Sequence, residues 1–232
     1  MTLALENPRR REMAHTRARA RRVELLGVPS FIVLDDVSWD LYEDLLKETE
    51  HQPVRITYDQ GRLVLMAPTS PVHEVPKGLL GRFVETCAEE LNVPIKSVGS
   101  ATWKRKDLGM GLESDECYFI QHEAQVRNKK TWNLRRDPPP DLAIEIEITN
   151  HPANRAQIYE ALGVGELWRC DGRRVSFFKL GADGRYSPIS SSQAMPSITS
   201  NAINHFLAMV GKTDDTTITR AFREWVGKHG NP

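Results

Sequence analysis

The sequence predicts an α/β protein with one main domain. Short runs with apolar residues at every second position, typical of strands, alternate with longer stretches in which apolar residues recur at helical spacing. The chain has 232 residues, of which 40% are hydrophobic and 27% charged, so it is long enough to bury one substantial core. The pattern contains no internal repeat and no clear second domain.

Composition excludes few functions. Lys and Arg together number 31, as do Asp and Glu, and this neutral total neither favours nor excludes nucleic-acid binding, because the distribution of charge matters more than its sum. The three cysteines are widely spaced and form no CxxC motif, which predicts reduced thiols and a cytoplasmic location. No apolar run reaches the roughly 18 residues of a membrane span, and we expect no secretory signal.

The first 29 residues form a basic arm that we expect to be helical or disordered over residues 1–22. Its candidate nucleic-acid-binding residues are Arg9, Arg10, Arg11 and Arg17. Such an arm can bind phosphate backbones. A solvated surface segment is an equal alternative, and a targeting sequence is a weaker third.

The next elements follow from caps, turns and periodicity. We expect an extended piece at 31–34, a helix at 39–49 capped by Ser38, and a hairpin formed by 54–58 and 63–66. A long helix extends to about residue 91; Ser70 can cap it, and Pro76 predicts that its regular part starts a few residues late. His73 and Glu74 lie at its start.

Shorter elements occupy the middle of the chain. We expect strands at 94–98, 101–105 and 115–120, a turn at 109–111, and a loop over 121–140. Asp115 stands at the mouth of its strand. Lys104 and Arg105 lie beside Trp103, a combination of basic and aromatic side chains that indicates nucleic-acid binding, although the patch is small.

The central strand, 141–149, carries an unusual row of acids. Isoleucines and Leu142 alternate with Asp141, Glu145 and Glu147, so the carboxylates share one face and repel one another. Two interpretations remain open from the residues alone. One face of the strand lies in water, or the acids line a cleft where a divalent cation offsets their repulsion.

The C-terminal part predicts a helix at 155–162 ended by Gly163, a hairpin of 166–169 with 174–178, and one more strand near 184–186. A helix at about 200–209 and a terminal helix with Phe222 and Trp225 follow. We therefore expect a main domain over residues 30–210 and a C-terminal helical extension over 211–232.

Four ordered segments resemble a known family. They are Tyr58 to Pro71 followed by His73, the strand from Ser114 to Ile120, Pro140-Asp141-Leu-Ala-Ile-Glu145-Ile146, and Tyr159-Glu-Ala-Leu-Gly-Val-Gly-Glu-Leu-Trp168. Together they are similar to the motifs of the Uma2 (DUF820) family of restriction-endonuclease-like proteins, within the PD-(D/E)xK nuclease superfamily. The resemblance implies a three-layer α/β fold with a central mixed sheet flanked by helices.

The resemblance also implies a site. Asp115 stands at the family's first metal-binding aspartate and Glu145 at the acid of the next strand. The superfamily lysine belongs two residues later, where this chain has Glu147, a further candidate catalytic residue and second ligand. In the Uma2 family it has moved to the following helix, where this chain has Arg155. Either His73 or Glu74 is a candidate accessory residue. Tyr159 and Trp168 are expected to be core residues.

The implied activity is metal-dependent endonucleolytic hydrolysis of DNA phosphodiester bonds, with Mg²⁺ or Mn²⁺ as the cofactor. Arg155 cannot act as a base, because a guanidinium stays protonated, but it can stabilise a phosphorane. This departure supports the alternative of a catalytically inactive nucleic-acid-binding or regulatory module. An interaction protein whose basic arm binds an acidic partner is a further alternative. Related nucleases often pair, so a homodimer also remains open.

Overall fold

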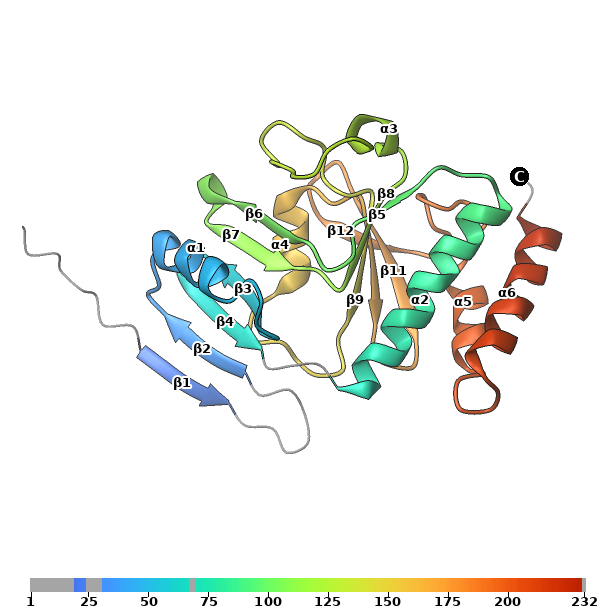
Figure 1. The fold of residues 1–232 in the computed structure, drawn as a ribbon, viewed down its shortest axis with the longest axis horizontal. Coiled ribbons are helices and arrows are strands. Elements are labelled where there is room, and N and C mark those ends of the chain that lie inside the picture. The colour runs from blue at the N-terminus through green and yellow to red at the C-terminus, as the bar shows by residue number, and fades with distance from the viewer. Residues whose placement is uncertain (1–18, 24–30, 67–69, 231–232) are drawn as a thin grey trace, which may run out of the picture.

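The computed structural model describes residues 19–23, 31–66 and 70–230, which form two six-stranded sheets with helices around them (Figure 1). In order across the first sheet, the strands are β1 (Arg19–Val23), β2 (Phe31–Asp35), β4 (Arg62–Met66), β3 (Arg55–Asp59), β7 (Met110–Glu113) and β6 (Thr102–Arg105). In order across the second, they are β12 (Tyr186–Ile189), β11 (Val175–Leu180), β10 (Glu166–Cys170), β9 (Leu142–Ile146), β8 (Glu116–Phe119) and β5 (Lys96–Ser97). The helices are α1 (Trp39–Glu48), α2 (Pro71–Glu90), α3 (Glu123–Val126), α4 (Arg155–Leu162), α5 (Ser200–Leu207) and α6 (Asp215–His229).

The second sheet is the central mixed sheet that the sequence predicts. Its strands pair antiparallel except β9 and β10, which are parallel and are joined by α4. Ile144 and Ile146 pack into a core shared with α2, α5 and α6, whereas Ala143 faces a second core that includes α4. Helices therefore cover both faces, and the expected three-layer α/β arrangement with C-terminal helices is confirmed.

Strand β9 is buried along its whole length, so the interpretation of a wet acidic face is wrong. A strand in the middle of a sheet with helices on both faces has no solvated side. Glu145 points towards the α4 face because it alternates with Ile144 and Ile146. A carboxylate in that position needs buried partners, since an unpaired charge there would cost several kcal/mol, on the order of its desolvation.

The first sheet is entirely antiparallel and is covered by α1. Tyr42 of α1 stacks on Tyr58 of β3 with ring centroids 4.8 Å apart. The expected turn at 109–111 is wrong for its last two residues: Gly109 makes the bend with φ 62°, and Met110 and Gly111 begin β7. Strand β7 leads through Ser114 and Asp115 directly into β8, which places Asp115 where the chain passes from one sheet to the other.

Three further expectations need correction. Arg19–Val23 form a strand on β2 rather than a helical or disordered arm, because the edge of β2 offers backbone groups that pair. Helix α2 starts at Pro71 and continues through Pro76, which is buried. Residues 121–140 include the short α3.

The C-terminal helices complete the main core. Phe222 of α6 lies against Phe83 of α2, with ring centroids 4.4 Å apart, and α5 contributes Phe206 to the same cluster. Among the described helices, none is long and apolar enough to cross a membrane.

Candidate active site

Asp115 is almost completely buried, with 2% of its surface exposed, and holds three partners from three elements. Arg55 of β3 donates to its Oδ1. Its Oδ2 accepts the backbone N–H of Ile146 at 2.7 Å and lies 3.2 Å from Nε2 of His73, in the first turns of α2. The loop between the sheets thus carries a carboxylate that both sheets and α2 hold in place.

Glu145 and Arg155 form a buried ion pair. Nε and Nη2 of Arg155 donate to the two carboxylate oxygens of Glu145 at 2.9 and 2.6 Å, and the Tyr159 hydroxyl donates to Glu145 as well. Nη1 of Arg155 donates to Thr57 Oγ1 at 2.9 Å, and Nη2 also donates to the carbonyl of Glu113 at 2.6 Å. Every nitrogen of the guanidinium therefore donates inside the protein, and the group is buried.

Burial and charge shift the pKa values of these groups in ways that agree with the contacts. Burial by itself lowers the pKa of Arg155, but the Glu145 carboxylate outweighs it, so the pKa is raised and the guanidinium stays charged. Burial lowers the pKa of His73 below its ordinary value, although Glu74, whose Oε1 lies 3.0 Å from Nδ1, acts in the opposite sense. His73 is thus held towards its neutral form beside Asp115.

The two acids line one small pocket together with His73, Arg155 and the end of β9. Its volume is about 30 Å³, which is room for one or two water molecules. The structure therefore brings together five residues that the sequence analysis selected, which are His73, Asp115, Glu145, Glu147 and Arg155.

Two further acids of the central strand, Glu147 and Asp141, are held by other partners. Glu147 lines the pocket but is held by Arg169, with Nη2 to Oε2 at 2.5 Å. Asp141 lies outside the pocket. It accepts the backbone N–H groups of Ile120 and His122 and thereby fixes the end of β8.

The described residues do not form a ready metal site. A divalent cation needs several free oxygen or nitrogen ligands, yet Asp115 is neutralised by Arg55 and Glu145 by Arg155. Among the residues that the structure describes, no group of three or more His, Cys, Asp or Glu side chains is placed to hold a metal ion. In this arrangement arginines stand against the carboxylates that the family resemblance assigns to a metal.

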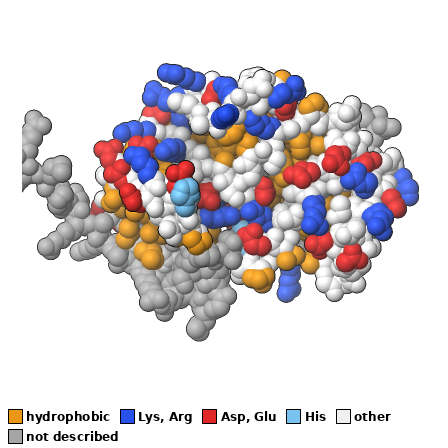
Figure 2. Space-filling model, viewed as in Figure 1, with side chains coloured by type: hydrophobic (Ala, Val, Ile, Leu, Met, Phe, Trp, Pro, Cys, Tyr) orange, Lys and Arg blue, Asp and Glu red, His pale blue; other side chains and the backbone are white. Residues whose placement is uncertain are grey.

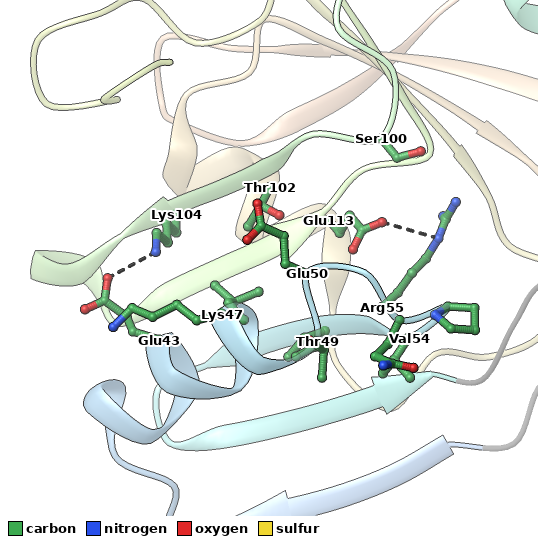
Figure 3. A pocket seen from close by; sticks show the side chains of 14 residues that line it. Glu43, Lys47, Thr49, Glu50, Val54, Arg55, Ser100, Thr102, Lys104 and Glu113 are labelled. Atoms are coloured by element: carbon green, nitrogen blue, oxygen red, sulfur yellow. Dashed lines mark hydrogen bonds and ion pairs between the residues drawn. The ribbon is translucent and has the colours of Figure 1, made fainter. Parts of the chain in front are cut away.

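A groove of about 570 Å³ lies on the other side of Arg55, between α1 and strands β6 and β7. Figure 3 shows Arg55 at one end of it, directed towards Glu113, with Nε 3.7 Å from Oε1. Lys104 stands at the other end and pairs with Glu43 at 3.1 Å. Acidic and basic side chains alternate along the groove, as they do over the face of the molecule in Figure 2, where neither sign forms a continuous field.

The predicted nucleic-acid-binding residues have different outcomes. Arg9, Arg10, Arg11 and Arg17 lie outside the described residues. Lys104 is neutralised by Glu43, and Arg105 donates to both oxygens of Asp107 at 2.9 and 2.7 Å. These ion pairs leave little free charge in the patch around Trp103, whose ring is buried in the core.

Sequence reasoning missed Arg55 and Thr57 as members of the site and expected Tyr159 to be a core residue only. Arg55 and Thr57 lie in an ordinary alternating strand, and no spacing or motif links them to Asp115 or Arg155, which are 60 and 98 residues away. Arg55 and Thr57 come close to Asp115 and Arg155 only because the two sheets face each other. Tyr159 is a core residue, as expected, but its hydroxyl also donates to Glu145.

A comparison with models of protein families shows to which family the chain belongs. The family model described as "Uma2: Putative restriction endonuclease" matches residues 39–207, which is most of the chain. The chain belongs to the Uma2 family. The match spans α1 to α5 and contains every residue of the pocket except Phe31. No curated protein matches the chain.

Proposed function

We propose that this Uma2 protein is a nuclease that hydrolyses DNA phosphodiester bonds at the pocket of Asp115 and Glu145. The observation that supports this most directly is the position of the pair. The two acids come from neighbouring segments of the mixed sheet and line one pocket, at the places that the family resemblance gives to catalytic carboxylates.

Phosphodiester hydrolysis requires an oriented water and stabilisation of the charge that develops on phosphorus. Under this proposal, Nε2–H of neutral His73 donates to Asp115, which fixes the orientation of the ring. Arg55 supplies positive charge next to the pocket. Restriction-endonuclease-like families generally use divalent metals such as Mg²⁺ or Mn²⁺, whereas here an arginine holds each of the two acids.

Arg155 acts, in this proposal, as a positioning residue and not as a group that contacts phosphate. All of its side-chain nitrogens donate within the protein, and its guanidinium is buried. Its task is to hold Glu145 in one orientation with the help of Tyr159.

The test is cleavage of plasmid and linear DNA in the presence of Mg²⁺, of Mn²⁺ or of EDTA. Asp115→Asn and Glu145→Gln keep the shape of the site, and each is expected to reduce cleavage at least about 100-fold, as the removal of a group that acts in the transition state does. Glu48→Ala, at an exposed acid of α1, is the matched control and should cleave like the parent. Equal cleavage by all four proteins, with folding verified by circular dichroism, would contradict the proposal.

A second candidate function is a nucleic-acid-binding module on a nuclease scaffold that does not cut. The two arginine–carboxylate pairs favour it, because they neutralise both acids without a metal. Titration calorimetry with Mn²⁺ separates the candidates. A parent protein that binds DNA, shows no Mn²⁺ binding that Asp115→Asn removes, and never cuts under any of the three conditions is the module.

A further inference from the structure

A hollow of about 860 Å³ lies at the start of α2, beside the end of α5. Its floor is apolar and comes from the first turns of α2 and the segment after α5, and three cations stand around it. The lining residues are Pro71, Val72, Val75, Pro76, Gly172, Arg173, Arg174, Leu207, Ala208, Val210 and Lys212. We call it the α2–α5 hollow, and Figure 1 shows the two helices side by side.

The three cations of the hollow are Arg173, Arg174 and Lys212, and none of them forms an ion pair with any residue in the described part of the chain. The nearest acid in sequence, Asp171, uses Oδ1 to accept the backbone N–H groups of Arg173 and Arg174 instead. Among the described residues, no carboxylate lines the hollow. Asp171 acts electrostatically on Arg173 and Arg174, but none of the three cations is held in an ion pair, in contrast to Lys104 and Arg105.

The floor of the hollow is unusually apolar for a surface. Val72, Val75 and Val210 are 61%, 44% and 39% exposed, and they are three of the five large hydrophobic side chains that are exposed among the described residues. Clustered exposed apolar residues mark binding surfaces more often than scattered ones do. An occupant must therefore bring both negative charge and apolar groups.

The hollow adjoins the candidate active site. Ser70 and His73 line the pocket of Asp115, whereas Val72 and Val75, on the same turns of α2, line the hollow. On the other side, Ile148 lines the pocket and lies against the turn at Gly172, where an added Cβ would come within 2.5 Å of its Cδ1. The hollow and the pocket of Asp115 thus share the first turns of α2 and the contact between Ile148 and Gly172.

We propose that the α2–α5 hollow is a docking site for a nucleic-acid strand. Phosphates pair with Arg173, Arg174 and Lys212, and the valines contact sugars and base edges. The choice of nucleic acid over an acidic peptide rests on the proposed nuclease function, because the hollow opens beside that site. The arginine-rich residues at the start of this chain carry the same sign as the cations and do not suit the hollow.

The experiment measures fluorescence anisotropy of a labelled 20-nucleotide strand and of the matching duplex, in EDTA and over a salt series, so that binding is measured without cleavage. The triple variant Arg173→Ser, Arg174→Ser and Lys212→Ser should weaken binding at least about tenfold at low salt. It should also reduce the slope of log K against log[salt] by about 2–3, because up to three phosphate contacts are lost. Comparing the affinities for the single strand and for the duplex shows which form of nucleic acid binds in the hollow.

A matched triple variant, Lys130→Ser, Arg220→Ser and Lys228→Ser, removes the same charge from exposed residues that do not line the hollow and should leave most of the slope intact. Val72→Ser with Val75→Ser should weaken binding without changing the slope. Equal slopes in the two triple variants, or a parent that binds neither probe, would overturn the inference. So would competition by oligoglutamate at concentrations far below those at which unlabelled DNA competes, which would indicate an acidic peptide. A protein that binds through the hollow but never cuts contradicts the proposed function alone.

Discussion

At the scale of single residues, two ion pairs define the site: Arg55 with Asp115, and Arg155 with Glu145. The sequence allowed Arg155 to be selected as the group that replaces a missing lysine, and the structure does place it on Glu145. The sequence could not show that each side-chain nitrogen of Arg155 would donate within the protein, or that Arg55 would pair with Asp115. Both facts depend on contacts between residues far apart in the chain, which no local pattern records.

His151 gives the residue scale a pH prediction. Burial, assisted by Arg155, lowers its pKa from 6.5 to about 4, and its Nδ1 accepts the backbone N–H of Ala153 at 3.0 Å. Because the folded pKa lies below the unfolded one, the unfolded state binds more protons between pH 6.5 and 4, so stability falls as the pH drops through that window. Since His151 is half-buried, we expect a loss of about 2 kcal/mol, from about 1.4 kcal/mol per pKa unit.

Urea unfolding at several pH values between 7 and 4 measures this loss. His151→Gln should flatten the dependence in that window, whereas His205→Gln, at an exposed histidine of α5, should not. If the parent and His151→Gln lose stability in parallel, His151 is not the group responsible.

At the scale of elements, helical stripes and strand alternation predicted nearly every helix and most strands. The hairpin of β3 and β4, the long α2 and the β9–α4–β10 unit all follow from period, caps and turn residues. The division into two sheets does not follow, because strand pairing between β3 and β7 joins segments about 50 residues apart, a contact that period alone leaves open. For the same reason the first two residues of β7, Met110 and Gly111, were expected to lie in a turn.

Two glycines provide a matched prediction at this scale. A Cβ on Gly111 of β7 would lie 2.3 Å from the Tyr42 hydroxyl and 3.0 Å from Lys104 Cβ, so Gly111→Ala forces α1 away from the sheet. We expect a destabilisation of about 1–3 kcal/mol from this overpacking. Gly78 lies exposed on α2 with no atom within 4 Å of an added Cβ, and Gly78→Ala should stabilise by about 0.5–1 kcal/mol.

Thermal and urea unfolding measure both effects. The free energy of unfolding should be lower than that of the parent in Gly111→Ala and higher in Gly78→Ala. A Gly111→Ala protein as stable as the parent would mean that α1 adjusts its position without loss of packing.

At the scale of the whole molecule, the candidate site is also the joint between the two sheets. Arg155 bonds Thr57 and the Glu113 carbonyl in the first sheet and Glu145 in the second, while Asp115 bonds Arg55 in the first and Ile146 in the second. Periodicity and family motifs predicted the fold class and selected five residues that line one pocket. They did not predict that these residues connect the sheets, because that role depends on how the sheets face each other.

Arg155→Met tests this joint. It leaves Glu145 buried without its cation, and breaking a buried pair typically costs about 3–5 kcal/mol. The control is Arg169→Met, whose pair with Glu147 has side chains 41% and 22% exposed and should contribute less than about 1 kcal/mol. Urea unfolding gives both values. Hydrogen exchange should also show earlier opening of β3 and β9 in Arg155→Met than in the control, and equal losses in the two variants would contradict a joint at this position.

The double duty of Asp115, Glu145 and Arg155 has a consequence for how such chains change over generations. Substitutions that remove any of them are expected to reduce stability, whether or not the protein cuts DNA. A relative that lost hydrolysis would therefore still be expected to retain all three residues. Their presence alone does not separate a nuclease from a protein that no longer cuts, and a cleavage assay is needed to do so.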